Sequence, residues 1–358
     1  MNFLARLKNL DWVLNSAIIF LVAASLISLS GSGQYFYRQF ISCVIAFAII
    51  IVFSQIDWRS FLNYSWIIQG LYYLSVVLLV FTYFAAPTIR GIKGWIVLGP
   101  LQFQASEFSK IALIIMLSAF WAKAHVGVAH KRNIFLSLIY FAVPAFLVMI
   151  QPDLGSVIIL FAIWFSYLLI SGIKWKHLLA AFVIFIFVGI FLWTSFLKDY
   201  QRERIIDFFN PGRDPLGVSY NVIQSKIAIG SAGFFGKGFG QGTQLRLGFL
   251  PEPRTDFILA AFIEEWGLLG GLLAVGAFLI ILLRIIKIGL VGENNFFRLF
   301  CLGAVIMFLA HFILNAGSNL GIFPVVGVPF PFFSYGGSNL LTSAFIIGII
   351  QSILLKSR

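Results

Sequence analysis

Residues 251–283 read PEPRTDFILAAFIEEWGLLGGLLAVGAFLIILL, and this stretch decides the fold. A polar turn with two prolines leads into a long apolar run whose only charges are Glu264 and Glu265. About 20 apolar residues in a helix cross a hydrocarbon core about 30 Å thick. The stretch therefore predicts a transmembrane helix over 257–283, which the chain enters through Asp256.

Apolar runs of this kind recur along all 358 residues, of which 60% are hydrophobic and 11% charged, with a mean hydropathy of +0.98. A soluble domain cannot hide so much apolar surface. The runs are also too long for the strands of a membrane barrel, which alternate over about 10 residues. We expect an all-α integral membrane protein, a single polytopic domain over 1–358. About ten transmembrane helices are predicted, at 11–29, 36–53, 65–84, 106–122, 134–150, 155–171, 177–196, 257–283, 297–315 and 337–355.

The net charge of +12 indicates membrane orientation rather than nucleic-acid binding. Lys and Arg concentrate in the cytoplasmic segments of membrane proteins. With the N-terminus inside, most basic residues fall on the inner side, and the short outer loops carry only Arg38, Arg90 and Lys93. An even number of spans then puts both termini in the cytoplasm. The long connection 197–256 becomes an extracytoplasmic loop between the seventh and eighth helices.

Acidic residues are scarce, 13 in all, so their placement is informative. On this topology most of them lie at or near the outer face. That distribution fits either chemistry at this face or simple charge balance, and both explanations stay open. The outer acids are Glu107, Asp153, Asp199, Glu203, Asp207, Asp214, Glu252, Asp256, Glu264 and Glu265.

The fourth predicted span opens with Ser106 and Glu107, which suit the N-cap and first turn of a helix. Lys110 lies three residues after Glu107, so the two side chains can pair on one helix face. A cation inside a span normally faces a cavity or a partner, which makes Lys110 a functional candidate. Asp153, between the fifth and sixth spans, either caps the next helix or points into a central cavity.

The long loop carries features that suit an anionic ligand or the membrane surface. Arg202 and Arg204 supply positive charge. Residues 220–227 place Tyr and Ile at helical spacing, as in an amphipathic helix that lies on the outer leaflet. The glycine-rich segment 236–242 either lets backbone N–H groups approach an anion or forms a flexible turn.

The acids around the eighth span also allow two explanations. Asp256, with Thr255, either caps the helix or serves a functional site. Glu264 and Glu265 lie inside the span, where acids are costly unless they face a cavity or a cation. We expect at least one of them to face the same interior as Asp256 and Lys110.

A loop rich in glycine and proline precedes the last span, at 321–339, and contains Ser334. Irregular backbone at membrane depth is tolerated only where protein buries it or water reaches it. The sequence therefore predicts an outward-facing cavity lined by this loop. The ninth span is expected to end near Asn315, followed by a polar Ala-Gly-Ser-Asn loop.

Taken in order, these motifs resemble the SEDS family, named for shape, elongation, division and sporulation, across essentially the whole chain. The compact length is more similar to the elongation branch of that family than to its division branch. The chain departs from the family pattern at Gly94, where Lys93 would supply the missing charge, at Ala105, and at the loop after Asn315. The matching stretches are Gly91-x-x-x-Trp95, Gln104-x-Ser-Glu-Phe-x-Lys110, Gln151-Pro-Asp-Leu-Gly155, Asn210-Pro211, Thr255-Asp-Phe257, Glu264-Glu-x-Gly267 and Pro324-x-x-Gly-x-Pro-x-Pro-x-x-Ser-Tyr-Gly-Gly337.

The resemblance implies a glycosyltransferase of the bacterial cytoplasmic membrane that polymerises peptidoglycan glycan strands from lipid II at the outer face during cell elongation. It also implies that Asp256 is the essential aspartate. The 4-hydroxyl of one lipid-linked disaccharide would attack the anomeric carbon of another, with inversion and release of undecaprenyl diphosphate. Asp256 would be the base, with a role as a metal ligand left open, and cations would stabilise the leaving group.

The resemblance further implies partners and a wider site. The partners would be lipid II, membrane lipids and a class B penicillin-binding protein, and not nucleic acid. A divalent cation, Mg²⁺ or Mn²⁺, could serve; its ligands are unknown, and no organic cofactor is expected. The basic site residues would bind the diphosphate, and the acidic ones would hold the cavity walls. The expected substrate-binding or cavity residues are Lys93, Glu107, Lys110, Asp153, Arg202, Arg204, Glu264 and Ser334.

Two other functions remain open at the level of sequence. A lipid II flippase would also use basic cavity residues and intramembrane carboxylates, although transporters often show inverted repeats, which we do not find here. A non-catalytic scaffold of wall synthesis would tolerate replacement of Asp256.

Overall fold

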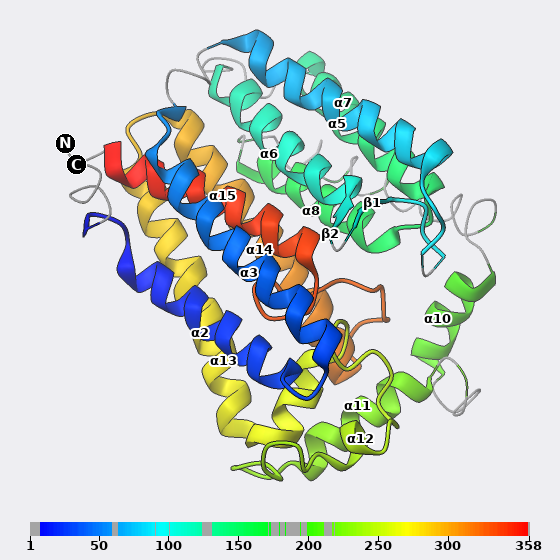
Figure 1. Ribbon diagram of the computed structural model, residues 1–358. Helices are drawn as coiled ribbons and strands as arrows, with labels where there is room; N and C mark the ends of the chain where they lie inside the picture. The colour runs from blue at the N-terminus through cyan, green and yellow to red at the C-terminus, as the bar shows by residue number, and fades with distance from the viewer. Residues whose placement is uncertain are drawn as a thin grey trace. The chain divides into compact units, whose positions relative to one another are not determined.

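The computed structural model describes residues 8–58, 64–89, 91–99, 101–123, 131–170, 172, 179, 183, 194, 199–210, 217 and 219–356. The architecture in this part of the chain is helical, with one short hairpin (Figure 1). Eight of its helices are long and apolar enough to cross a membrane, and α8 is a shorter apolar helix. The apolar helices are α2 Trp12–Leu29, α3 Gly33–Gln55, α5 Ser65–Ala85, α6 Ala105–Lys123, α7 Lys131–Ile150, α8 Leu154–Ile170, α13 Ile258–Val291, α14 Asn295–Leu320 and α15 Gly337–Lys356.

The predicted all-α membrane fold is confirmed, and each of these helices covers one predicted span. The seventh predicted span, 177–196, lies outside the described residues apart from isolated positions. The long loop contains three helices, α10 Asp199–Phe209, α11 Tyr220–Ser231 and α12 Thr243–Arg246. Of these, α11 is the helix that the spacing of Tyr and Ile predicts.

One local element was not predicted, and one local prediction was wrong. The segment before α6 folds as an antiparallel hairpin of β1 Trp95–Leu98 and β2 Leu101–Gln104, in which Trp95 pairs with Gln104. Strands of four residues are too short to show an alternating pattern. The loop expected after Asn315 is instead helical, because α14 continues to Leu320. Its polar side chains find partners inside the protein, so a low hydropathy did not mark the end of the helix.

The chain forms two compact units. The first comprises Met1–Tyr167, Ala274–His311 and Pro331–Arg358, and the second comprises Leu168–Leu273 and Phe312–Phe330.

In the first unit, α15 packs along α3, and α5 packs against both α6 and α7 (Figure 1). The helices α6 and α15 are the most buried of the candidate spans. Near the chain ends, the Asp11 carboxylate accepts the Leu14 N–H at the start of α2 and forms an ion pair of 2.6 Å with Arg284. The side-chain carbonyl of Gln351, near the end of α15, accepts the Asp11 N–H at 2.9 Å. The beginning of α2 and the end of α15 therefore lie together.

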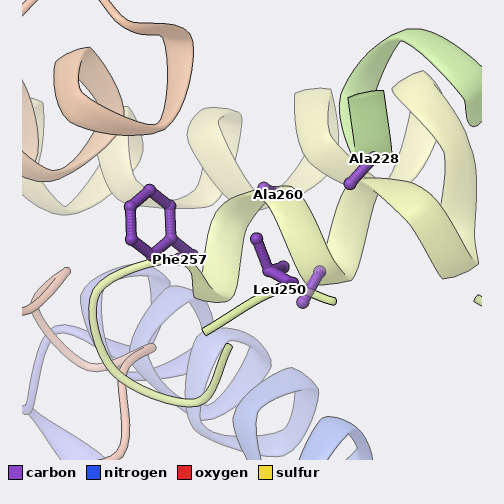
Figure 2. Packing of buried hydrophobic residues seen from close by; sticks show 5 residues of the cluster. Ala228, Leu250, Phe257 and Ala260 are labelled. Carbon is purple, nitrogen blue, oxygen red and sulfur yellow. The ribbon is translucent and has the colours of Figure 1, made fainter. Parts of the chain in front are cut away.

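In the second unit, a small apolar core joins α11 to the beginning of α13 (Figure 2). Ala228 of α11 and Leu250 of the following loop pack with Phe257 and Ala260. This core fixes the segment that leads into α13, including Asp256.

The helix α13 is broken at Gly267, where the backbone takes φ 75° and ψ −178°. The loop segment 233–238 supplies the hydrogen bonds that the break removes. Lys237 and Gly238 donate backbone N–H groups to the carbonyls of Glu264 and Glu265, and the carbonyls of Gly233 and Phe234 accept from Leu268 and Leu269. Backbone groups inside a membrane protein must be paired. This exchange of four bonds therefore lets a membrane helix change direction without exposing polar backbone.

Candidate active site

Asp256 is a half-buried residue two positions before the first residue of α13. The segment around Gly327, from the last loop, lies beside it: a Cβ built on Gly327 would be 3.8 Å from Asp256 Oδ2. The Thr255 hydroxyl, next to Asp256 in sequence, donates to the Glu252 carboxylate at 3.1 Å. The structure thus brings the predicted catalytic carboxylate together with the Gly- and Pro-rich loop.

The backbone carbonyl of Asp256 accepts two side-chain amides from α14. Asn315 donates to it at 3.0 Å and Asn319 at 2.7 Å. The side-chain carbonyl of Asn319 also accepts the N–H of Ala260 at 3.0 Å. Ala260 is the third residue of α13, and this N–H is one that a helix cap normally satisfies. Asn319, from α14, therefore caps the first turn of α13, a role that the sequence allowed for Thr255 or Asp256.

Glu264 is completely buried, and its carboxylate is surrounded by donors from the loop. It forms an ion pair of 2.8 Å with Lys237 and accepts backbone N–H groups from Gln244 at 2.9 Å and Leu245 at 3.2 Å. Glu265 accepts the N–H of Gly240 at 3.0 Å. The anion approached by the glycine-rich segment is thus supplied by the protein's own carboxylates. This arrangement gives Glu264 a local structural role, and its place in a substrate cavity stays a prediction.

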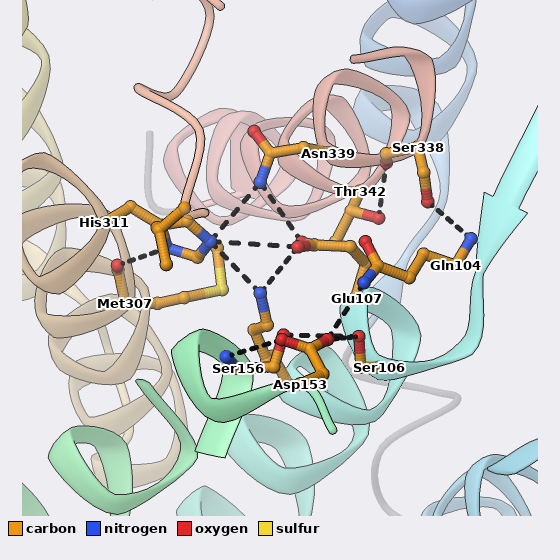
Figure 3. A network of polar contacts seen from close by, with 12 residues as sticks. Gln104, Ser106, Glu107, Asp153, Ser156, Met307, His311, Ser338, Asn339 and Thr342 are labelled. Carbon is orange, nitrogen blue, oxygen red and sulfur yellow. Dashed lines mark hydrogen bonds and ion pairs between the residues drawn. The ribbon is translucent and has the colours of Figure 1, made fainter. Parts of the chain in front are cut away.

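In the first unit, Lys110 is buried with 1% of its side chain exposed. Its ammonium lies 2.6 Å from the Glu107 carboxylate, which confirms the predicted pair on α6, and 3.1 Å from His311 Nε2. Asn339 of α15 donates to the other Glu107 oxygen at 3.1 Å. Figure 3 shows Glu107, His311 and Asn339 turned toward one another between α6, α14 and α15.

The hydrogen bonds of His311 define its tautomer. Its Nδ1 lies 2.8 Å from the Met307 carbonyl, which can only accept, so Nδ1 carries the proton. Its Nε2 faces two donors, the Lys110 ammonium at 3.1 Å and the Asn339 amide at 3.4 Å. Nε2 therefore presents a lone pair, and the imidazole is neutral. Lys110 donates to Glu107 and has His311 as a second acceptor.

Asp153 combines the two roles that the sequence left open. Its Oδ1 accepts the Ser156 N–H at 3.1 Å, three residues on, which is the cap of α8. Its Oδ2 accepts from Gln104 and from Ser106, each at 2.9 Å (Figure 3). Ser106 was predicted as the N-cap of α6, but α6 begins at Ala105 and the Ser106 hydroxyl binds Asp153 instead.

The remaining predicted site residues are spread over the loops. Lys93 is exposed beside the hairpin. Arg202 donates to the Thr194 carbonyl at 3.1 Å, and Arg204 donates to the Val325 carbonyl at 3.3 Å. Arg204 therefore contacts the loop segment that passes Asp256. Ser334 is buried, and its carbonyl accepts from a side-chain amide of α3 at 3.4 Å.

The structure gathers the predicted residues into two sets. Glu107, Lys110 and Asp153 share the interior of the first unit, whereas Asp256 and Arg204 belong to the second. Residues that sequence reasoning missed are His311, Asn315, Asn319 and Asn339, all polar and all nearly buried. The polar residues at 311, 315 and 319 recur every four positions, which places them on one face of a helix. This spacing is the signal in the sequence that could have identified three of them.

No three His, Cys, Asp or Glu side chains converge on a common point in the described part of the chain.

Comparison with known proteins identifies relatives along the whole chain. The family model described as "Cell cycle protein", which groups FtsW, RodA and SpoVE, matches residues 7–358. The chain is 36% identical over 337 residues to the peptidoglycan glycosyltransferase MrdB of Escherichia coli K12, covering 93% of this chain and 90% of MrdB. It is 33% identical over 325 residues to a probable peptidoglycan glycosyltransferase FtsW of Trichlorobacter lovleyi, covering 90% and 84%.

Solved structures share the fold. A chain from "Structural coordination of polymerization and crosslinking by a peptidoglycan synthase complex" has a TM-score of 0.82 at 29% identity, covering 97% of this chain and 98% of that one. The crystal structure of the rod shape determining protein RodA of Thermus thermophilus has a TM-score of 0.70 at 25% identity, covering 96% of each. The full-length family match and these similarities show that the chain belongs to the FtsW, RodA and SpoVE family, the SEDS proteins that its motifs resemble.

Proposed function

We propose that this multi-pass membrane protein is a peptidoglycan glycosyltransferase that polymerises lipid II into glycan strands. The curated relatives that it matches over 90% or more of its length carry this activity in their names. Within the chain, the proposal depends on how Asp256 is held. Two buried amides fix its backbone carbonyl, and its carboxylate faces the loop around Gly327.

In the proposed reaction, Asp256 accepts the proton of the sugar 4-hydroxyl as that oxygen attacks the anomeric carbon of the second lipid-linked disaccharide. The bond from this carbon to the diphosphate breaks, and configuration inverts. A base must lie within hydrogen-bond reach of the attacking hydroxyl, and holding both reactants in place supplies much of the rate.

The leaving diphosphate needs positive charge. Arg202 and Arg204 reach solvent in the same unit as Asp256 and are the proposed contacts, whereas the role of Lys93, in the first unit, stays a prediction. Lys110 is buried in its pair with Glu107 and His311, so it would contact a diphosphate only where that pair opens. We propose that Glu107, Asp153 and Lys110 chiefly set the positions of α6, α8 and α15.

A divalent cation remains part of the proposal without a site assigned to it. The described residues contain no group of three or more His, Cys, Asp or Glu side chains, and Mg²⁺ is commonly held by one or two carboxylates together with substrate phosphates. Titration of Mg²⁺ and Mn²⁺ into metal-free enzyme, with wild type and Asp256→Glu compared, measures any dependence directly.

We also propose the membrane, the orientation and the partner of the protein. The protein would lie in the bacterial cytoplasmic membrane with both termini inside, act at the outer face during elongation, and work with a class B penicillin-binding protein. One support is the similarity to a chain from a synthase complex that couples polymerization and crosslinking.

The test uses purified protein, alone and with a partner penicillin-binding protein, and labelled lipid II in detergent. We expect wild type and the control Glu252→Gln to give glycan ladders on a gel. A folded Asp256→Asn variant should give at least 100-fold less product. Ladders from Asp256→Asn would contradict the role of the carboxylate. Absence of ladders from wild type, with translocation of lipid II in liposomes, would favour a flippase instead.

A further inference from the structure

The second unit contains a polar arrangement that does more than cap α13. Asn315 and Asn319 lie one helical turn apart on α14, with exposed fractions of 1% and 0%. Both direct their side-chain amides to one acceptor, the backbone carbonyl of Asp256, at 3.0 and 2.7 Å. A buried polar group is costly unless it is paired, so two amides on one carbonyl fix that peptide group tightly.

The bonds of Asn319 also define which way its amide points. Its nitrogen faces two carbonyls, those of Asp256 at 2.7 Å and Asn315 at 2.8 Å, and its oxygen faces the N–H of Ala260 at 3.0 Å. Its own backbone carbonyl accepts the Ser225 hydroxyl at 2.8 Å. One side chain thus ties the peptide group of Asp256 to the first turn of α13.

Asn315 connects the Asp256 peptide group to the loop segment that contains Gly327 and Val328. Its amide donates to the carbonyl of Val328 at 2.9 Å as well as to that of Asp256. Val328 follows Gly327, whose position beside Asp256 Oδ2 is described above. The same side chain therefore sets the spacing between Asp256 and the loop segment that faces its carboxylate.

We propose that Asn315 and Asn319 are positioning residues that hold the Asp256 carboxylate at the angle and depth needed to accept the proton of the sugar hydroxyl. This inference rests on the proposed function of Asp256. Neither amide touches the reacting atoms; both act through the peptide group of Asp256. Small displacements of a catalytic group cost about 100-fold in rate. Loss of either amide should therefore lower kcat while leaving substrate binding nearly intact.

The experiment measures kcat, KM and the thermal midpoint for purified full-length variants on labelled lipid II. Asn319→Leu removes all its side-chain bonds, Asn319→Asp keeps the acceptor for Ala260 but loses the donors, and Asn315→Leu tests the second amide. Ser318→Ala is the matched control, because its buried hydroxyl bonds the Asn315 backbone carbonyl within α14 and no hydrogen bond joins it to Asp256 in the part of the chain that the structure describes. We expect kcat to fall about 10- to 100-fold in the three Asn variants, with KM within twofold of wild type.

A double variant separates positioning from general stability. If Asn319 acts through Asp256, Asp256→Glu combined with Asn319→Leu should be no slower than Asp256→Glu alone, because the carboxylate is already displaced. Independent, multiplying losses would overturn the inference, as would Asn variants whose kcat stays within threefold of wild type. The inference would also be overturned if the loss of kcat in each variant were fully explained by the fraction of protein that is unfolded. If Asn319→Leu does not fold, Asn319→Asp and Asn315→Leu decide the question. Inactive wild type would instead contradict the proposed function itself.

Discussion

Among single residues, Lys110 shows how this chain keeps a charge inside a membrane helix. Its ammonium has a carboxylate at 2.6 Å and a neutral imidazole at 3.1 Å, and all of these groups are buried. Removing one partner of a buried pair leaves an uncompensated charge and costs about 3–5 kcal/mol, whereas removing both costs much less. The pair is therefore more sensitive to a single replacement than to a double one.

This asymmetry gives the first prediction. Lys110→Met should lower the thermal midpoint more than the double variant Glu107→Gln with Lys110→Met. Lys123→Met, at the exposed end of the same helix, is the control and should stay close to wild type. Thermal unfolding in detergent measures all three. Equal losses in the single and double variants would mean that Glu107 and Lys110 are not energetically coupled.

The second prediction concerns the acceptor at His311. His311→Gln can place an amide oxygen near the position of Nε2, whereas His311→Leu leaves Lys110 with one acceptor fewer. We expect His311→Leu to destabilise the protein by about 1–3 kcal/mol, and His311→Gln by less. The wild-type imidazole should give the nitrogen NMR signature of a neutral ring protonated at Nδ1. An Nε2-protonated or charged ring would contradict the hydrogen bonds described here.

At the scale of elements, the contact between the loop 233–238 and the break in α13 depends on two glycines. Gly236 and Gly267 both have positive φ, and a Cβ added to either would overlap the backbone of the facing segment. Backbone overlap cannot be relieved by a change of rotamer. The two glycines are therefore the positions where this element tolerates no side chain.

The third prediction follows from this overlap. Gly236→Ala and Gly267→Ala should each reduce the yield of folded protein severely, because a positive φ that only glycine adopts readily adds about 1–3 kcal/mol to the cost of the clash. Gly276→Ala, in the same helix with open space around it, should be neutral or slightly stabilising. Detergent gel filtration and thermal unfolding separate these outcomes. Normal behaviour of Gly267→Ala would show that the break can straighten into regular helix.

At the scale of the whole molecule, the cluster around Asp11 joins the beginning of α2 to α13 and to the end of α15. The Asp11 carboxylate is 1% exposed, whereas Arg284 is 28% exposed, so the carboxylate depends on its partner more than the arginine does. This contact links the first helix to α13.

The fourth prediction tests that link. Arg284→Met should destabilise the protein, because it leaves the buried Asp11 carboxylate with only the Leu14 N–H among the bonds described above. Asp11→Asn should cost less, because it removes the charge together with the need to balance it. Thermal midpoints at neutral pH measure both. A smaller effect for Arg284→Met than for Asp11→Asn would contradict this order.

The sequence could place the apolar helices because a helix that crosses the bilayer requires a long apolar run, which is visible in the sequence. It could pair Glu107 with Lys110 because spacing on a helix fixes which side chains meet. It could not find the end of α14 or the role of Asn319, since hydropathy does not distinguish a polar group in a loop from one paired inside the protein. The exchange of bonds at Gly267 was equally hidden, because it joins segments whose residues look like an ordinary turn and an ordinary span.

The exchanged bonds at the break in α13 also bear on how the protein is made. Residues 233–238 leave the ribosome before residues 264–269, so the loop backbone is available before the helix half that needs it enters the bilayer. The open carbonyls and amides at the break can then be paired during insertion and need never face lipid. A membrane helix that cannot complete its own bonds is thus preceded in synthesis by the segment that completes them.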